Sequence, residues 1–202
     1  MSTQSLYRWG AATTIGAALL LVAAAIALVV VPDGGLANPV APTLFYTSLI
    51  LTAPAYFTIY TAQAPAAGKL GFAGFVMSLI GSIMYSGPVF VLMAGTSGVA
   101  TWHDTWGYAM GNVLPLGASL FLIGSTMFGI ATRRAGVFSR QAGLLLAVGS
   151  FLWLVAFYVA PFLLPIANLL NAAALFWLGI GLLPRAQEGP VGVRQAAGNW
   201  NP

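Results

Sequence analysis

The chain has 202 residues, of which 59% are hydrophobic and 5% charged, and its net charge is +4. A soluble domain normally carries about a quarter charged residues, so this composition excludes a water-facing surface and predicts an integral membrane protein in a lipid bilayer. In such a protein basic residues mark one side of the membrane, so the positive charge does not indicate nucleic-acid binding. The absence of cysteine excludes disulfides, thiolate metal sites and thiol catalysis.

Long apolar runs predict six transmembrane helices of about 20 residues each. In chain order they are 9–31, 43–63, 70–94, 108–132 and the stretch 141–183, which is long enough for two spans. A hairpin is expected at 160–165, because Pro161 and Pro165 would break a continuous helix there. Residues 1–183 therefore form one all-α membrane bundle, and the Gly- and Pro-rich segment 184–202 is expected to be a mobile tail.

The distribution of basic residues predicts the orientation of this six-helix bundle. All seven lie on one side of it: Arg8, Lys69, Arg133, Arg134, Arg140, Arg185 and Arg194. The loops on the opposite side carry Asp33, His103 and Asp104 instead. The positive-inside rule therefore places both termini in the cytoplasm.

A stripe of small residues runs along the third predicted span. Gly74, Ser78, Ser82 and Ser86 are spaced four residues apart and share one helix face. Close backbone approach is a main source of helix association in lipid, so the stripe predicts a tight helix contact. The contact is expected within the bundle, and docking of a partner span or a second copy is the alternative.

The predicted spans contain no Asp, Glu, Lys, Arg or His. Proton relays, voltage sensors and many ion-coupled transporters use ionisable groups inside the membrane, so these classes are disfavoured. The only candidate for acid–base chemistry is the pair His103 and Asp104, whose neighbouring side chains do not readily form a dyad. A catalytic role is therefore disfavoured.

This pair lies in an aromatic loop with Trp102 and Trp106. Because Trp and Tyr favour the bilayer interface, the loop is expected to anchor the chain there. The alternative is that His103 is a single axial ligand of a haem or a chlorophyll-type pigment. One histidine and no cysteine provide no further metal site.

Neutral polar residues gather in the half of the bundle that faces away from the basic residues. They are Tyr46, Thr47, Ser48, Tyr85, Asn112, Tyr158, Asn168 and Asn171. Hydrogen bonding between helices is the simpler interpretation, and a pocket for a neutral ligand, opened by Pro54, Pro88 and Pro115, is the alternative. Trp102, His103, Asp104 and Trp106 would contribute to the same ligand site.

The basic turn 132–137 and the Ala-Gly-Leu run 141–146 that follows it resemble those of many small bacterial membrane proteins of uncharacterised function. The resemblance covers about 30 residues. It implies a multi-pass protein of the bacterial cytoplasmic membrane and assigns no functional residue.

Three functional hypotheses follow from the sequence. The first is a non-catalytic subunit that packs against other membrane subunits. The second is a carrier or binding protein for a neutral or lipid-like molecule, and the third is a membrane enzyme centred on His103 and Asp104.

Overall fold

The computed structural model describes residues 2–30, 40–96 and 109–187, and these residues form helices without any strand. The long helices are α1 (Thr3–Val30), α2 (Val40–Thr96), α4 (Leu114–Ala135), α5 (Arg140–Tyr158) and α6 (Leu164–Gln187). A π-helical turn (Ala109–Val113) precedes α4, and a 3-10 turn (Pro161–Leu163) precedes α6. The all-α class is confirmed, and five helices are long and apolar enough to cross a membrane.

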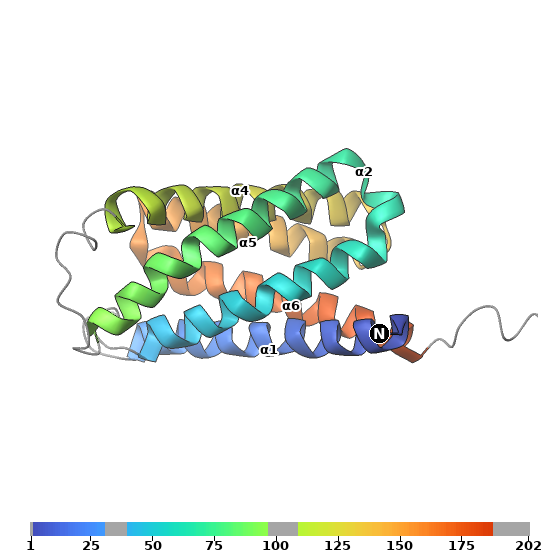
Figure 1. Cartoon of the computed structure of the whole chain (residues 1–202), viewed down its shortest axis with the longest axis horizontal. Helices are drawn as coiled ribbons and strands as arrows, with labels where there is room; N and C mark the ends of the chain where they lie inside the picture. The colour runs from blue at the N-terminus through green and yellow to red at the C-terminus, as the bar shows by residue number, and fades with distance from the viewer. Residues whose placement is uncertain (1, 31–39, 97–108, 188–202) are drawn as a thin grey trace, which may run out of the picture.

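Helix α2 folds back on itself at Gly68, where the backbone leaves the helical region with φ 60° and ψ −165°. Figure 1 shows its first arm (40–67, cyan) and its second arm (69–96, green) running in opposite directions from this turn. The turn lies in the segment 65–69, where the sequence predicted a connection. It is tighter than a loop, because Pro65 still lies within the helix and Gly68 alone departs from it.

The helices form a bundle in which each long helix packs against its neighbours (Figure 1). Helix α1 lies against the first arm of α2 and against α6, and α4 lies between the second arm of α2 and α5. The basic residues that the structure describes lie at the end where α1 begins and α6 ends, and the turn between α5 and α6 lies at the other end.

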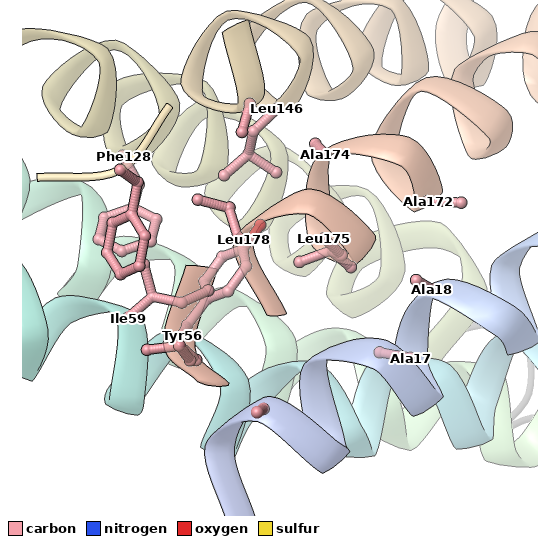
Figure 2. Close-up of a cluster of buried hydrophobic side chains, with 14 of the residues drawn as sticks. Ala17, Ala18, Tyr56, Ile59, Phe128, Leu146, Ala172, Ala174, Leu175 and Leu178 are labelled. Carbon is pink, nitrogen blue, oxygen red and sulfur yellow. The ribbon is translucent and has the colours of Figure 1, made fainter. Parts of the chain in front are cut away.

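The interior holds many small and hydroxyl side chains together with aliphatic and aromatic ones, and other large apolar side chains cover the outside. Figure 2 shows one part of this core, in which Phe128, Ile59 and Leu146 approach Leu178 from three different helices. Exposed large side chains include Phe57, Phe72, Ile83, Phe151, Phe162 and Trp177. A surface of this kind requires an apolar solvent, which agrees with a membrane protein.

The tight helix contact that the small-residue stripe predicts lies between the second arm of α2 and α4. A Cβ atom added at Gly74 would lie 2.6 Å from the backbone nitrogen of Phe128, and one added at Gly124 would lie 2.5 Å from that of Ser78. The Ser78 and Ser125 hydroxyls are 3.3 Å apart across this contact. The predicted contact within the bundle therefore includes the first half of the stripe.

Beyond Ser78 the closest approach continues through Gly81, whose added Cβ would meet the backbone of Phe121, and through Tyr85, whose backbone nitrogen lies 2.7 Å from a Cβ added at Gly117. An α-helix has 3.6 residues per turn, so residues spaced strictly by four rotate about 40° at each step. The contacting residues stay on one helix face because they are spaced four, three and four residues apart, at Gly74, Ser78, Gly81 and Tyr85. Ser82 and Ser86 do not belong to this series.

Two predicted boundaries can be compared with the helix ends. The hairpin expected at 160–165 is confirmed, since α5 ends at Tyr158 and α6 begins at Leu164. The expected start of the tail at 184 is wrong, because α6 continues through Pro184 to Gln187, and the rest of the expected tail lies outside the described residues. Arg185 holds this last turn by donating a hydrogen bond of 3.0 Å to the Val137 carbonyl oxygen and by lying 4.6 Å from the centre of the Phe138 ring.

Candidate functional site

A cavity of about 280 Å³ lies toward the end of the bundle opposite the described basic residues. All five long helices contribute to its walls, which are mostly apolar. The lining includes Ala24, Leu28, Ala41, Phe45, Val89, Leu114, Ala156, Phe157 and Leu164. We call this space the larger cavity.

A smaller cavity of about 30 Å³ adjoins it, with room for about two water molecules. Its lining is more polar and includes Ser48, Thr52, Ser150, Asn168 and Asn171. Four residues contribute to the lining of both cavities, namely Phe45, Tyr85, Trp153 and Asn168. These four residues therefore lie at the boundary between an apolar space and a polar one.

Three of the four boundary residues form an aromatic cluster. The Phe45 and Trp153 rings stack, with centroids 5.4 Å apart and an interplanar angle of 19°. The Tyr85 ring meets both edge-on, at 5.8 Å from Phe45 and 6.2 Å from Trp153. Such pairs add specific geometry to apolar burial, so the cluster gives the larger cavity a well-defined inner wall.

Two polar groups of the boundary residues are not used in hydrogen bonds within the described part of the chain. The Trp153 indole N–H donates to Asn168 Oδ1 at 2.7 Å, and Ser150 Oγ donates to Asn171 Oδ1 at 3.1 Å. Within the described residues, the Asn168 side-chain amide N–H₂ and the Tyr85 hydroxyl form no hydrogen bond. Both residues are almost fully buried, so a polar atom placed inside the cavities would be within reach of groups that are otherwise shielded from water.

Local sequence explains why the polar side chains of α6 reach this place. Asn168 and Asn171 are three residues apart and so share one face of α6, as the sequence indicates. Gly149 on α5 makes room for this face, because a Cβ there would lie 2.9 Å from Asn171 Oδ1. The glycine therefore lets the two helices approach closely enough for both asparagines to bond to α5.

The structure brings together half of the polar residues that the sequence singled out. Tyr85, Asn168, Ser48 and Asn171 line the smaller cavity. The other four lie outside both cavities: the Tyr46 ring meets the Phe90 ring, Thr47 bonds to the carbonyl of its own helix, Asn112 is exposed, and Tyr158 donates to the Pro115 carbonyl oxygen at 3.0 Å.

The aromatic loop residues Trp102, His103, Asp104 and Trp106 lie outside the described residues. Pro54, Pro88 and Pro115, expected to open a pocket, do not line the larger cavity, whose prolines are Pro42 and Pro161. Sequence reasoning missed Phe45, Trp153 and Ser150. The one available signal was Trp153, a tryptophan placed far from the ends of its predicted span.

Comparison of the chain with protein-family models, with curated proteins and with solved structures found no match. The chemistry of the site is therefore inferred from its own residues alone. Among the described residues, the lining of the two cavities offers hydroxyl, amide and indole groups and no carboxylate, imidazole or cationic side chain. This arrangement suits binding of an uncharged molecule.

Proposed function

We propose that this chain crosses the bacterial cytoplasmic membrane six times and binds a small, uncharged, mainly apolar molecule in the larger cavity. The observation that carries the proposal is the combination of apolar walls with two hydrogen-bonding groups, on Tyr85 and Asn168, that have no partner among the described residues. Ligand sites in proteins are typically apolar with a few placed polar groups of this kind.

The number of crossings is inferred from the length and the shape of α2. Its apolar part, Val40–Phe90, has 51 residues and would measure about 76 Å as a straight helix. The hydrocarbon core of a bilayer is about 30 Å thick, so a single crossing cannot contain it. The reversal at Gly68 gives two arms of suitable length, which together with the four other long helices make six spans.

Cysteine labelling tests this topology against a background that contains no native cysteine. A cysteine at Asp33 or Gly98 is expected to react with a membrane-impermeant maleimide in intact cells, because both positions would face outward. A cysteine at Ala135 or Gln187 should react only after the membrane is opened. Labelling of position 135 in intact cells would refute the six-span arrangement with cytoplasmic termini.

The cavity also restricts the ligand. A volume of about 280 Å³ is at the lower end of ligand pockets, so the ligand is small. The Tyr85 hydroxyl and the Asn168 amide N–H₂ can both donate a hydrogen bond. A carbonyl or hydroxyl oxygen on an aliphatic or aromatic body fits these donors and the apolar walls.

A subunit role is the competing hypothesis, and it predicts stable partner chains after mild solubilisation. It rested on the absence of ionisable groups within the predicted spans, on the lack of a soluble domain and on the small-residue stripe, and the first half of that stripe contacts α4 of the same chain. The stripe therefore no longer favours an external partner. The hypothesis of an enzyme centred on His103 and Asp104 concerns residues outside the described part and stays a prediction.

Photolabelling with a short diazirine-bearing aliphatic alcohol tests the binding proposal. In detergent-solubilised wild-type protein, labelling is expected to concentrate on cavity residues such as Phe45, Val89 and Phe157. The variant Ala156→Phe adds a ring to the cavity wall and should reduce this labelling severalfold, while tryptic mapping shows unchanged labelling of the outer surface.

The matched control is Val148→Phe on the same helix, because Val148 is 46% exposed on the outside of the bundle. It should leave the cavity labelling unchanged. Labelling spread evenly over outward-facing residues in the wild type, or equal labelling in the wild type and Ala156→Phe, would contradict the proposal.

A further inference from the structure

A groove of about 350 Å³ lies between α4 and α5, at the end of the bundle opposite the two cavities described above. Three arginines line it, Arg133 and Arg134 from the last turn of α4 and Arg140 from the first residue of α5. The rest of its lining is apolar, namely Ile130, Leu144 and Ala147. The groove thus joins a basic region to an apolar surface.

Close helix packing places these arginines together. A Cβ added at Gly143 would lie 2.6 Å from the backbone nitrogen of Arg133, so the start of α5 presses directly against the end of α4. Gly136, with φ 66°, ends α4 in the left-handed conformation that glycine adopts readily and permits the short turn to Arg140. The backbone packing of α4 against α5 therefore brings the three arginines together.

The three guanidinium groups have no counter-charge in the described part of the chain. They are exposed, form no ion pair or side-chain hydrogen bond there, and no aspartate or glutamate occurs among the described residues. Helix α5 begins beside them, and Ser139 at its N-cap makes no side-chain capping bond, so the positive end of the helix dipole adds to the same potential.

We propose that this groove binds an anionic phospholipid, with the phosphate on the arginines and an acyl chain along the apolar wall. The wall continues away from the arginines as an outward-facing surface formed by Ile123, Val148 and Phe151, which are 41%, 46% and 57% exposed. Basic pockets between transmembrane helices recognise anionic headgroups in this way. The inference requires only that the chain lies in a membrane and is independent of the ligand in the larger cavity.

The positive-inside rule accounts for basic residues on this side of the membrane and does not require them to share a groove. Arg8 and Lys69 lie at the same end of the bundle, are also exposed and do not line the groove. Arg185 is engaged by the Val137 carbonyl oxygen and the Phe138 ring. Arg8 and Lys69 are therefore matched controls for charge alone.

Native mass spectrometry of the full-length protein in a mild detergent tests the proposal with added phosphatidylglycerol or phosphatidylcholine. The wild type should retain one phosphatidylglycerol at least tenfold more tightly than phosphatidylcholine. A basic residue near an anionic headgroup contributes about fivefold in affinity, so the triple variant Arg133→Gln, Arg134→Gln, Arg140→Gln should lose about 100-fold. The double variant Arg8→Gln, Lys69→Gln should stay within about twofold of the wild type.

A second variant keeps every charge and fills the groove. Leu144→Trp changes a side chain that is 41% exposed, so it should fold normally and still lose phosphatidylglycerol binding. Equal losses in the triple variant and the Arg8/Lys69 control would show a nonspecific charge effect and overturn the proposal. It is likewise overturned if Leu144→Trp binds normally, if the wild type has no lipid preference, or if inorganic phosphate at millimolar concentration displaces the lipid.

Discussion

Replacing Gly124 with leucine is expected to lower the free energy of unfolding by about 3 kcal/mol or more, at the upper end of the cost of overpacking a core. A Cβ at this position would lie 2.5 Å from the backbone nitrogen of Ser78 and 2.9 Å from the carbonyl oxygen of Gly74. These are backbone atoms on the facing helix and cannot rotate away. The second arm of α2 would have to separate from α4, which removes the close contact that holds helices together in lipid.

Gly87→Leu is the matched control on the second arm of α2, because a Cβ there would have nothing within 4 Å. It should leave stability unchanged or raise it slightly, since leucine favours the helix more than glycine does. Thermal or detergent-induced unfolding, followed by tryptophan fluorescence, measures both variants. Equal stability of Gly124→Leu and the wild type would mean that α4 and α2 do not meet along this face.

Phe128→Ala is expected to cost about 3–5 kcal/mol. The Phe128 ring is fully buried where α2 meets α4, 5.1 Å from the Tyr56 ring, and its removal leaves a cavity that the surrounding helices cannot close without losing other contacts. The same unfolding assay applies. The loss of stability should appear as a lower midpoint of denaturation for Phe128→Ala than for the wild type.

Phe151→Ala is the matched control, because it removes the same atoms from a side chain that is 57% exposed. A phenyl ring in contact with lipid exchanges one apolar environment for another on unfolding within the membrane, so its removal should change stability by less than about 1 kcal/mol. A larger loss for Phe151→Ala than for Phe128→Ala would show that the inside and the outside of the bundle are assigned wrongly.

Much of the fold could be predicted from the sequence, because apolar length and turn-forming residues carry the information. Pro161 and Pro165 predicted the hairpin between α5 and α6, and the segment 65–69 predicted the reversal within α2. Ends of helices were less predictable. Pro184 suggested a stop, but contacts of Arg185 with the preceding α4–α5 turn hold one more helical turn in place.

The candidate site was predictable only in part, for a reason that is specific to lipid. In a soluble helix the apolar face identifies the core, whereas here apolar residues occupy both the interior and the surface. Polar residues therefore gave the directional signal for the site, and it identified Tyr85 and Asn168. Phe45 carries no such signal, so its place against Trp153 could not be distinguished from the exposed position of Phe57.

The conformation of Gly68 has a consequence for the whole second half of the chain. With φ 60° and ψ −165° it lies in a region that is essentially reserved for glycine, while its mirror image, near −60° and 165°, is an ordinary conformation for an L-residue. A D-amino acid at this position would therefore fit the turn that an L-amino acid resists. Glycine, which is achiral, adopts this conformation without the strain that an L-side chain would bring.

In a polytopic protein each reversal changes the side on which the next connection emerges. An even number of crossings before a given residue leaves it on the side where the chain began, and an odd number leaves it on the other. In the proposed six-span arrangement, a chain that did not turn at Gly68 would have every segment from α4 onward inverted with respect to the N-terminus, so the groove arginines would lie on the opposite side of the membrane. The side of the membrane that each later segment faces in this proposed arrangement thus depends on the turn at Gly68.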